Sequence, residues 1–265
     1  MARGRAYGVI APAMHRASTM LGLHRRTLAQ VIRVRRVAID TGLGMRIVLA
    51  ADVHAHERFF PRERVREVVE LINSLDGVDL VAMPGDFVGH DVRAIEWTAA
   101  ELSRLAAPAF ATLGNHDHME GAAIVERALS HAGVEVVTNR FVELDERRGI
   151  GVLGVDSLFA RRPRIGEIDA LVPEGKRAVV LGHEPALATM HRQMLHLAGH
   201  THHGQIRIPG IALRYLPSGS RPYPEGLATI DDGDDCRFVY TTGGLGSTTV
   251  PLRIGVPPEI VVIDA

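Results

Sequence analysis

The sequence MRIVLAADVH at residues 45–54 joins a short run of branched apolar residues directly to Asp52 and His54. The run at residues 45–51 has the length and composition of a buried β-strand. Two further strand-like runs, at residues 78–83 and 109–113, lead into Gly-Asp at 85–86 and Gly-Asn-His-Asp at 114–117. In open α/β sheets, ligands bind outside the carboxyl ends of the strands. We therefore expect these polar residues to converge in space.

The segments between these strands have helical spacing. The predicted helices cover residues 62–75, 92–105 and 121–131. In the first of them, apolar residues recur at the intervals of one helix face: Val65, Val68, Val69 and Ile72. Alternation of strands and helices predicts βαβ units, a parallel sheet and right-handed crossovers.

The second half of the chain is richer in short strands. The candidates, separated by Gly, Pro, Asp and Ser, are residues 134–137, 141–144, 151–155, 178–181, 206–208, 238–241 and 260–263. Few long helical stretches lie among them. We therefore expect a second, mixed sheet that faces the first, and an α/β fold overall.

Composition excludes several classes of protein. Of the 265 residues, 46% are hydrophobic and 23% are charged, which excludes collagenous, mucin-like and disordered chains. The single cysteine, Cys236, excludes an intramolecular disulfide and a cysteine-based zinc site, and it fits a reducing compartment. No apolar run approaches the roughly 18 residues of a transmembrane helix, and the first residues lack the pattern of a signal peptide. A cytoplasmic protein is expected.

Charge is distributed unevenly along a chain whose net charge is −1. Residues 1–36 contain eight arginines and no acidic residue, whereas the remainder carries 22 basic and 31 acidic side chains. We expect residues 1–40 to form a basic N-terminal arm and residues 41–265 to form a single domain. This asymmetry points to a polyanionic surface as a partner of the arm.

The arm has two interpretations. Apolar residues alternate with arginines between residues 14 and 37, as in an amphipathic helix that lies on anionic lipid. Residues 1–36 would then hold the protein at the inner face of the membrane as a peripheral protein. The alternative is a basic, partly disordered extension. Nucleic acid is disfavoured as a partner because the acidic body repels a phosphate backbone.

Polar residues at the strand ends have the chemistry of metal ligands. Seven of them stand out: Asp52, His54, Asp86, Asn115, His183, His200 and His202. In extended backbone, residues two apart face the same side, so Asp52 and His54, and likewise His200 and His202, can share a cation. Carboxylate, amide and imidazole ligands suit Mn²⁺, Fe²⁺ or Zn²⁺. Seven exceed the needs of one cation, whereas two cations about 3.5–4 Å apart that share a carboxylate would use them all.

The ordered blocks D-x-H, G-D, G-N-H-D, G-H and G-H-T-H over residues 45–265 resemble the calcineurin-like metallophosphoesterase superfamily. The tail, with GGLGS at residues 243–247, PLR at 251–253 and PPEI at 257–260, resembles a bacterial branch of that superfamily. That branch includes membrane-associated members and relatives that cleave the pyrophosphate of UDP-2,3-diacylglucosamine in lipid A biosynthesis. The resemblance implies a four-layer α/β/β/α sandwich.

The resemblance also implies a role for each matching residue. The first metal would be held by Asp52, His54, Asp86 and His202. The second would be held by Asp86, Asn115, His183 and His200, with Asp86 bridging the two metals. His116 would stabilise the developing charge or protonate the leaving oxygen, and Asp117 would orient it. A metal-bridging hydroxide would attack phosphorus in line.

Five further residues are candidate substrate contacts. His90 and His118 flank the metal blocks, Asn139 and Asp156 end strand-like runs, and His203 stands where the superfamily often has glycine. Ordinary surface or turn roles are the alternative for each of them. The second block reads GDFVGH at residues 85–90, without the arginine that protein phosphatases use to grip phosphate, which disfavours a phosphoprotein substrate.

The function expected is that of a dinuclear metal-dependent phosphoesterase. Its substrate would be a small-molecule or lipid-linked phosphoester or pyrophosphate, a nucleotide sugar included. One alternative is a phosphodiesterase that acts on nucleotides or glycerophosphodiesters. Another is a non-catalytic metal-binding interaction module, which the complete ligand set together with His116 disfavours.

Overall fold

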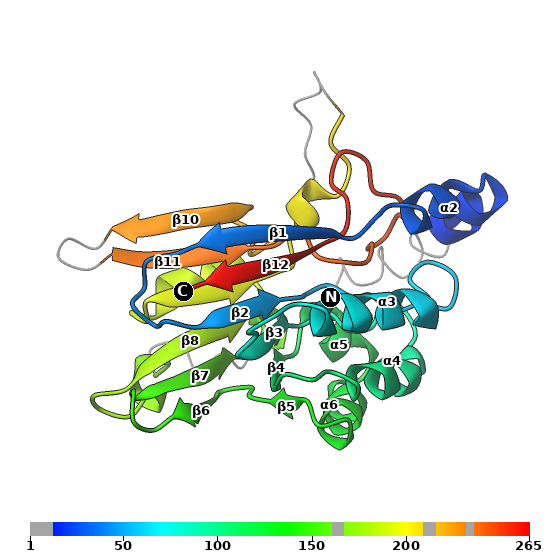
Figure 1. Ribbon diagram of the computed structural model, residues 1–265. Coiled ribbons are helices and arrows are strands. Elements are labelled where there is room, and N and C mark those ends of the chain that lie inside the picture. Colours follow the sequence, from blue (N-terminus) through cyan, green and yellow to red (C-terminus); the bar gives the residue numbers. More distant parts are fainter. Residues whose placement is uncertain (1–12, 161–166, 209–215, 232–235) are drawn as a thin grey trace.

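The computed structural model describes residues 13–160, 167–208, 216–231 and 236–265. Their strands form two six-stranded sheets (Figure 1). The first has the order β1-β12-β2-β3-β4-β5, with bounds Arg33–Ala38, Glu259–Asp264, Arg46–Leu49, Leu80–Pro84, Ala109–Thr112 and Glu135–Val136. The second has the order β10-β11-β9-β8-β7-β6, with bounds Gly226–Asp231, Cys236–Thr241, Leu195–Ala198, Arg177–Gly182, Ile150–Val155 and Arg140–Asp145. Both sheets are mixed, because each combines parallel and antiparallel pairs.

The two sheets pack face to face over an apolar core. Ile47 and Leu49 of the first sheet share this core with Val179 and Leu197 of the second. The outer face of the first sheet is covered by α3 (Arg62–Asn73), α4 (Ala94–Leu102) and α6 (Ala122–His131). Short 3-10 helices, among them η3 (Pro185–Met190), pack on the outer face of the second sheet. The expected α/β/β/α sandwich is confirmed, although its fourth layer is thin.

The helices form where the apolar spacing predicts them. In α3, Val65, Val68, Val69 and Ile72 are buried against the first sheet, as the helical intervals require. The structure adds α5 (Asn115–Glu120), which begins directly after β4 and carries the Asn-His-Asp block. Among the described residues, no helix combines the length and apolar character needed to cross a membrane.

Several predicted strands have a different place or form. Residues 206–208 make an isolated bridge from Ile206 to Ile254, so the prediction of a strand there is wrong. The strands at 134–137 and 260–263 belong to the first sheet, where β5 pairs with β4 and β12 pairs with β1 and β2. The strand that ends before Gly199 was expected without a range and is β9, whereas β10 was not predicted.

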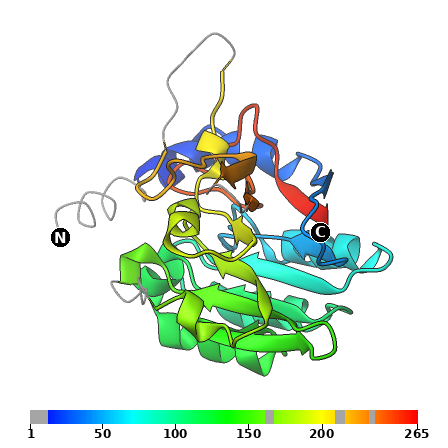
Figure 2. The same ribbon diagram turned by 90° about the vertical axis from the view of Figure 1, so that its left-hand side faces the viewer.

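The N-terminal segment is only partly helical. Residues 13–20 are helical and α2 spans Leu23–Leu28, while residues 1–12 of the predicted arm lie outside the described residues. The prediction of a helix as far as residue 37 is wrong, because Arg33–Ala38 form strand β1 and pair in parallel with β12. Figure 2 shows this blue segment beside the red C-terminal strand. Strand β12 pairs with β1 on one side and with β2 on the other, and Arg35 Nε donates to Glu259 Oε2 at 3.2 Å across the β1–β12 pair.

A buried carboxylate links α3 to α4. Glu101 is 1% exposed and accepts hydrogen bonds from Arg62 Nε at 2.6 Å, Arg66 Nη2 at 3.0 Å and Arg104 Nη1 at 2.7 Å. The hydrogen bond from Arg66, followed by those from Arg62 and Arg104, outweighs burial and lowers the pKa of Glu101 to about 2. Folding therefore favours the ionised carboxylate.

We predict that Glu101→Gln lowers the free energy of unfolding by about 1–2 kcal/mol at pH 7, because charged hydrogen bonds are lost. The folded pKa lies below the unfolded value, so the contribution is full above the unfolded pKa of 4.5 and is lost as pH falls toward 2. Urea unfolding of both proteins from pH 7 to pH 4 measures the difference. A difference that grows on acidification would contradict this assignment.

Candidate metal centre

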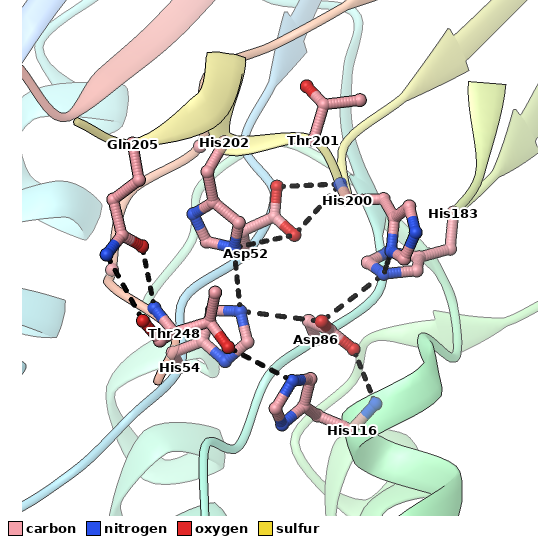
Figure 3. A network of polar contacts seen from close by, with 12 residues as sticks. Asp52, His54, Asp86, His116, His183, His200, Thr201, His202, Gln205 and Thr248 are labelled. Carbon is pink, nitrogen blue, oxygen red and sulfur yellow. Dashed lines mark hydrogen bonds and ion pairs between the residues drawn. The ribbon is translucent and has the colours of Figure 1, made fainter. Parts of the chain in front are cut away.

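The seven candidate ligands come from five strand ends. Asp52 and His54 follow β2, Asp86 follows β3, and Asn115 opens α5 after β4. His183 follows β8, whereas His200 and His202 follow β9. The strands of both sheets thus deliver these side chains to one place, where the aspartates and histidines surround a common centre (Figure 3). All six of these aspartate and histidine side chains are buried.

Asp86 lies at the middle of the cluster. Its Oδ2 is 3.4 Å from His54 Nε2 and 3.3 Å from His183 Nε2. On one side, His54 Nε2 is 3.0 Å from His202 Nε2, which in turn is 3.8 Å from Asp52 Oδ1. On the other side, His183 Nε2 is 3.1 Å from His200 Nδ1 and 3.2 Å from Asn115 Oδ1. One carboxylate oxygen therefore separates two groups of ligands.

This donor set fits divalent cations. Imidazole nitrogens that approach one another at about 3 Å are poor hydrogen-bond partners, since only one ring of each pair can contribute a proton. The same nitrogens, together with carboxylate oxygens, are the usual ligands of Zn²⁺, Mn²⁺ and Fe²⁺. Three groups in the cluster have ligand atoms within 4.8 Å of one another: Asp52-His54-His202, His54-Asp86-His116 and Asp52-Asp86-His183.

Burial and charge keep three of the ligands, His54, His202 and Asp86, in the protonation states that bind metal. Burial, followed by the charge of His116, lowers the pKa of His54 well below its ordinary value. Burial, followed by His54 and Arg253, has the same effect on the pKa of His202. Burial opposes ionisation of Asp86, but His183 and His116 outweigh it and hold the pKa of this carboxyl well below its usual range. Neutral imidazoles and an ionised carboxylate are the forms that bind metal.

The backbone at the ligands is not extended. The expectation that Asp52 and His54, and likewise His200 and His202, face one side because they are two apart in an extended strand is therefore wrong. Asp52 has φ 54° and His54 has φ 43°, whereas His200 and His202 have φ 68° and 47°. Asp86 also has a positive φ, of 58°. Left-handed backbone is uncommon outside glycine and costs about 1–3 kcal/mol per residue. The ligands thus face the centre because the backbone turns sharply at the end of each strand.

Close packing of backbone makes these turns possible. A Cβ at Gly114 would lie 2.2 Å from Asp86 Oδ1, and a Cβ at Gly199 would lie 2.5 Å from Asp52 Oδ2. A Cβ at Gly246 would likewise lie 2.2 Å from Val53 O. These glycines leave space for the ligand carboxylates, so the loops can reach one centre.

His116 lies at the edge of the cluster. Its Nδ1 is 2.9 Å from Gly89 O, and because a carbonyl only accepts, Nδ1 carries the proton. Its backbone N–H donates to Asp86 Oδ1 at 2.8 Å. Figure 3 shows the ring turned toward His54 and Asp86, and the centroids of the His54 and His116 rings are 4.6 Å apart.

Asp117 binds backbone groups through its carboxylate, whereas it was expected to orient the His116 ring. Its carboxylate accepts hydrogen bonds from the backbone N–H groups of Asp86, Phe87, Val88 and Gly114, at 2.8–3.2 Å. Asp117 therefore fixes the loop that carries Asp86. Orientation of His116 comes from the carbonyl of Gly89 instead.

The five candidate substrate contacts lie in three places. The His90 ring is 5.7 Å from the His116 ring, at the rim of the cluster. His118 Nε2 pairs with Asp156 Oδ1 at 2.8 Å, and Asp156 N donates to Asn139 Oδ1 at 3.1 Å. His203 Nε2 lies 2.9 Å from Thr241 O, so that side chain packs against β11.

Sequence reasoning did not assign roles to three residues beside the ligands. Arg253 is buried and its Nη2 lies 3.0 Å from His202 Nδ1. The same guanidinium donates to the carbonyls of Gly243, Gly246 and Val256. Gln205 and Thr248 form a second connection, on the side of His116. In the sequence, Arg253 was marked only by its place in the PLR pattern at residues 251–253. No sequence pattern marked Gln205 or Thr248.

Residues 45–204 match the model of the calcineurin-like phosphoesterase family, and the chain belongs to this family. It is 30% identical over 239 residues to the phosphodiesterase YaeI of Escherichia coli (strain K12), covering 85% of this chain and 83% of that protein. It is 29% identical over 229 residues to the uncharacterized metallophosphoesterase YkuE of Bacillus subtilis (strain 168), covering 83% of this chain and 78% of that protein. These relationships make the chain a metal-dependent phosphoester hydrolase.

A solved structure shares the fold. The 5'-nucleotidase precursor of Thermus thermophilus matches with a TM-score of 0.52 and 15% sequence identity. The match covers 82% of this chain and 54% of that one, so this chain corresponds to about half of the larger protein.

The packing at Gly114 leads to a prediction. Its φ of −97° is open to any residue, so Gly114→Ala acts only through the collision of Cβ with Asp86. We expect the variant to stay folded and to lose at least about tenfold in Mn²⁺ affinity, a typical cost of disturbing a ligand's support. Isothermal titration calorimetry with Mn²⁺ measures the affinity, and circular dichroism checks the fold. Unchanged affinity would show that Asp86 does not bind metal.

Proposed function

We propose that the protein binds two divalent cations and hydrolyses a phosphodiester or pyrophosphate bond in a small-molecule or lipid-linked substrate. Asp52, His54, Asp86 and His202 would hold one cation. Asp86, Asn115, His183 and His200 would hold the other. The observation that carries the proposal is the position of Asp86 Oδ2, which is 3.4 Å from His54 Nε2 and 3.3 Å from His183 Nε2.

Two bound cations would supply positive charge for the phosphoryl oxygens and an acidified water as the nucleophile. The chain's own residues would place the substrate and move the leaving-group proton. His116 Nδ1 is held by Gly89 O, so Nε2 is the atom that faces the cluster. A protonated His116 Nε2 could donate to the leaving oxygen, which is general acid catalysis. The name of the relative YaeI supports a diester among the substrate classes.

A test with Mn²⁺ and bis(p-nitrophenyl) phosphate examines this proposal. We expect p-nitrophenol release that requires Mn²⁺, stops on chelation and returns when the metal is restored. With diphenyl phosphate, whose phenoxide leaving group needs a proton, His116→Ala should lower the rate by at least about 100-fold, because positioned acid–base help is lost. His131→Ala removes an exposed histidine on α6 and should leave the rate unchanged.

The outcomes separate the alternatives. Equal rates for wild type and His116→Ala with diphenyl phosphate would overturn the role given to His116. Faster hydrolysis of p-nitrophenyl phosphate than of the diester would favour a phosphomonoesterase. Tight Mn²⁺ binding without hydrolysis of any ester would favour the metal-binding module.

A lipid-linked substrate is supported by the surface beside the site. Met20 is 87% exposed and Leu21 is 71% exposed, next to the exposed side chains of Arg25 and Arg26. The helical residues 13–20 reach the rim of the site, where the rings of His15 and His90 are 4.8 Å apart. Met20 and Leu21 thus form an exposed apolar tip close to arginines, which is suited to an anionic membrane surface. Docking there would bring a lipid phosphate close to the cluster.

We predict that Met20→Ser with Leu21→Ser weakens binding to phosphatidylglycerol vesicles by at least about tenfold, because each buried apolar side chain contributes about 1.5–3 kcal/mol. Substitution is preferred to truncation, since residues 33–38 form β1. Leu227→Ser is the control, as Leu227 is 42% exposed on β10, the edge strand of the second sheet, which Figure 1 shows apart from α2. Vesicle sedimentation measures binding, and equal binding by all three proteins would refute membrane docking through this tip.

A further inference from the structure

A side-chain connection joins the loop of His202 to the ring of His116. The connection consists of Gln205 and Thr248, and Figure 3 shows both beside the cluster. Gln205 follows the last ligand by three residues, whereas Thr248 lies between β11 and β12. The two residues are 43 positions apart in the chain.

The Gln205 side chain forms hydrogen bonds with the backbone of the loop that carries Thr248. Its Oε1 accepts from Thr248 N at 2.8 Å, and its Nε2 is 3.1 Å from Thr248 O. The same Nε2 also lies 2.6 Å from Val250 O and 3.2 Å from Leu252 O. One amide thus pairs with both backbone groups of Thr248, as a neighbouring strand would. Gln205 is 8% exposed, so these bonds are shielded from water.

These hydrogen bonds accompany unfavourable backbone conformations at two residues. Gln205 has φ 54° and Thr249 has φ 54°, and left-handed backbone is unfavourable for both residues, particularly for the β-branched threonine. The backbone adds a bond from Ile254 N to Gln205 O at 3.1 Å. Strained residues persist when the surroundings determine them, and they gather at functional sites.

Thr248 completes the connection. Its Oγ1 lies 3.3 Å from His116 Nε2. Because Nδ1 of this ring donates to Gly89 O, the neutral ring has its lone pair on Nε2, and the Thr248 hydroxyl donates to it. The imidazole is thereby fixed at both nitrogens, by a backbone carbonyl on one side and a hydroxyl on the other.

We propose that Thr248, held by Gln205, is a positioning residue that sets the direction of His116 Nε2 toward the leaving oxygen. This inference rests on the proposed role of His116 as the proton donor. In the neutral ring the hydroxyl donates to Nε2. Once the ring has taken up a proton from solvent at Nε2, this N–H donates to the leaving oxygen and passes the proton to it. Gln205 couples this geometry to the loop of His202.

Thr248→Val tests the inference, because valine keeps the shape of threonine and removes only the hydroxyl. Bis(p-nitrophenyl) phosphate has a good leaving group that needs little protonation, whereas diphenyl phosphate releases a more basic phenoxide. We expect kcat to fall about tenfold with diphenyl phosphate and about twofold with the nitrophenyl ester, as loss of one hydrogen bond allows. KM should change by less than about twofold, since the proton is needed in the transition state.

Thr248→Ser is the matched control, and it should stay within about twofold of wild type because it keeps the hydroxyl. In the His116→Ala background, Thr248→Val should have no further effect, since the two residues act as a unit. Imidazole nitrogen NMR of the metal-free protein gives a readout besides activity. The Nε2 resonance of His116 should shift in Thr248→Val and return in Thr248→Ser.

The results separate this inference from the proposed function. Equal losses with both esters, or a Thr248→Val enzyme that matches wild type while His116→Ala is impaired, would overturn the positioning role alone. If His116→Ala retains full activity, the role proposed for His116 fails, and the inference fails with it. An unmoved His116 Nε2 resonance in Thr248→Val would also contradict the contact.

Discussion

The structure depends on one buried negative charge, the carboxylate of Asp86. Isolated in a protein interior, a carboxylate is costly unless charged or hydrogen-bonding groups compensate it. His54 and His183 approach the same oxygen, Oδ2, at 3.4 and 3.3 Å, while the other oxygen accepts the backbone N–H of His116. The loop that carries Asp86 is fixed in turn by the carboxylate of Asp117. The two facing sheets deliver all of these groups to one point.

Sequence patterns predicted the parts of the fold that depend on local periodicity. The apolar spacing of α3 and the short apolar runs of β2, β3 and β4 gave the first sheet and its helices. Strand β1 escaped prediction because its arginine-rich sequence resembles a surface helix, and only pairing with β12 makes it a strand. The sheet to which β12 belongs is likewise a non-local property. Residues 206–208 looked like a strand because apolar Ile206 and Ile208 alternate with Arg207, yet they make a single bridge.

The ligand blocks could be predicted because strand ends and glycine punctuation mark them in the chain. The way in which they converge could not, because it depends on left-handed backbone at Asp52, His54 and Asp86, which alternation in an extended strand does not describe. The hydrogen-bond partners of the His116 ring could not be predicted from the sequence either. Gly89 contributes a carbonyl, which every residue has, and Thr248 comes from a loop with no periodic signal.

Family membership, the fold and the clustered ligands together make the chain a metal-dependent phosphoester hydrolase. We propose beyond this that Asp86 bridges two cations. A crystal grown with Mn²⁺ and measured near the manganese absorption edge tests it most directly. We expect two anomalous peaks about 3.5–4 Å apart with the carboxylate of Asp86 between them. A single peak, or a pair that Asp86 does not touch, would contradict it.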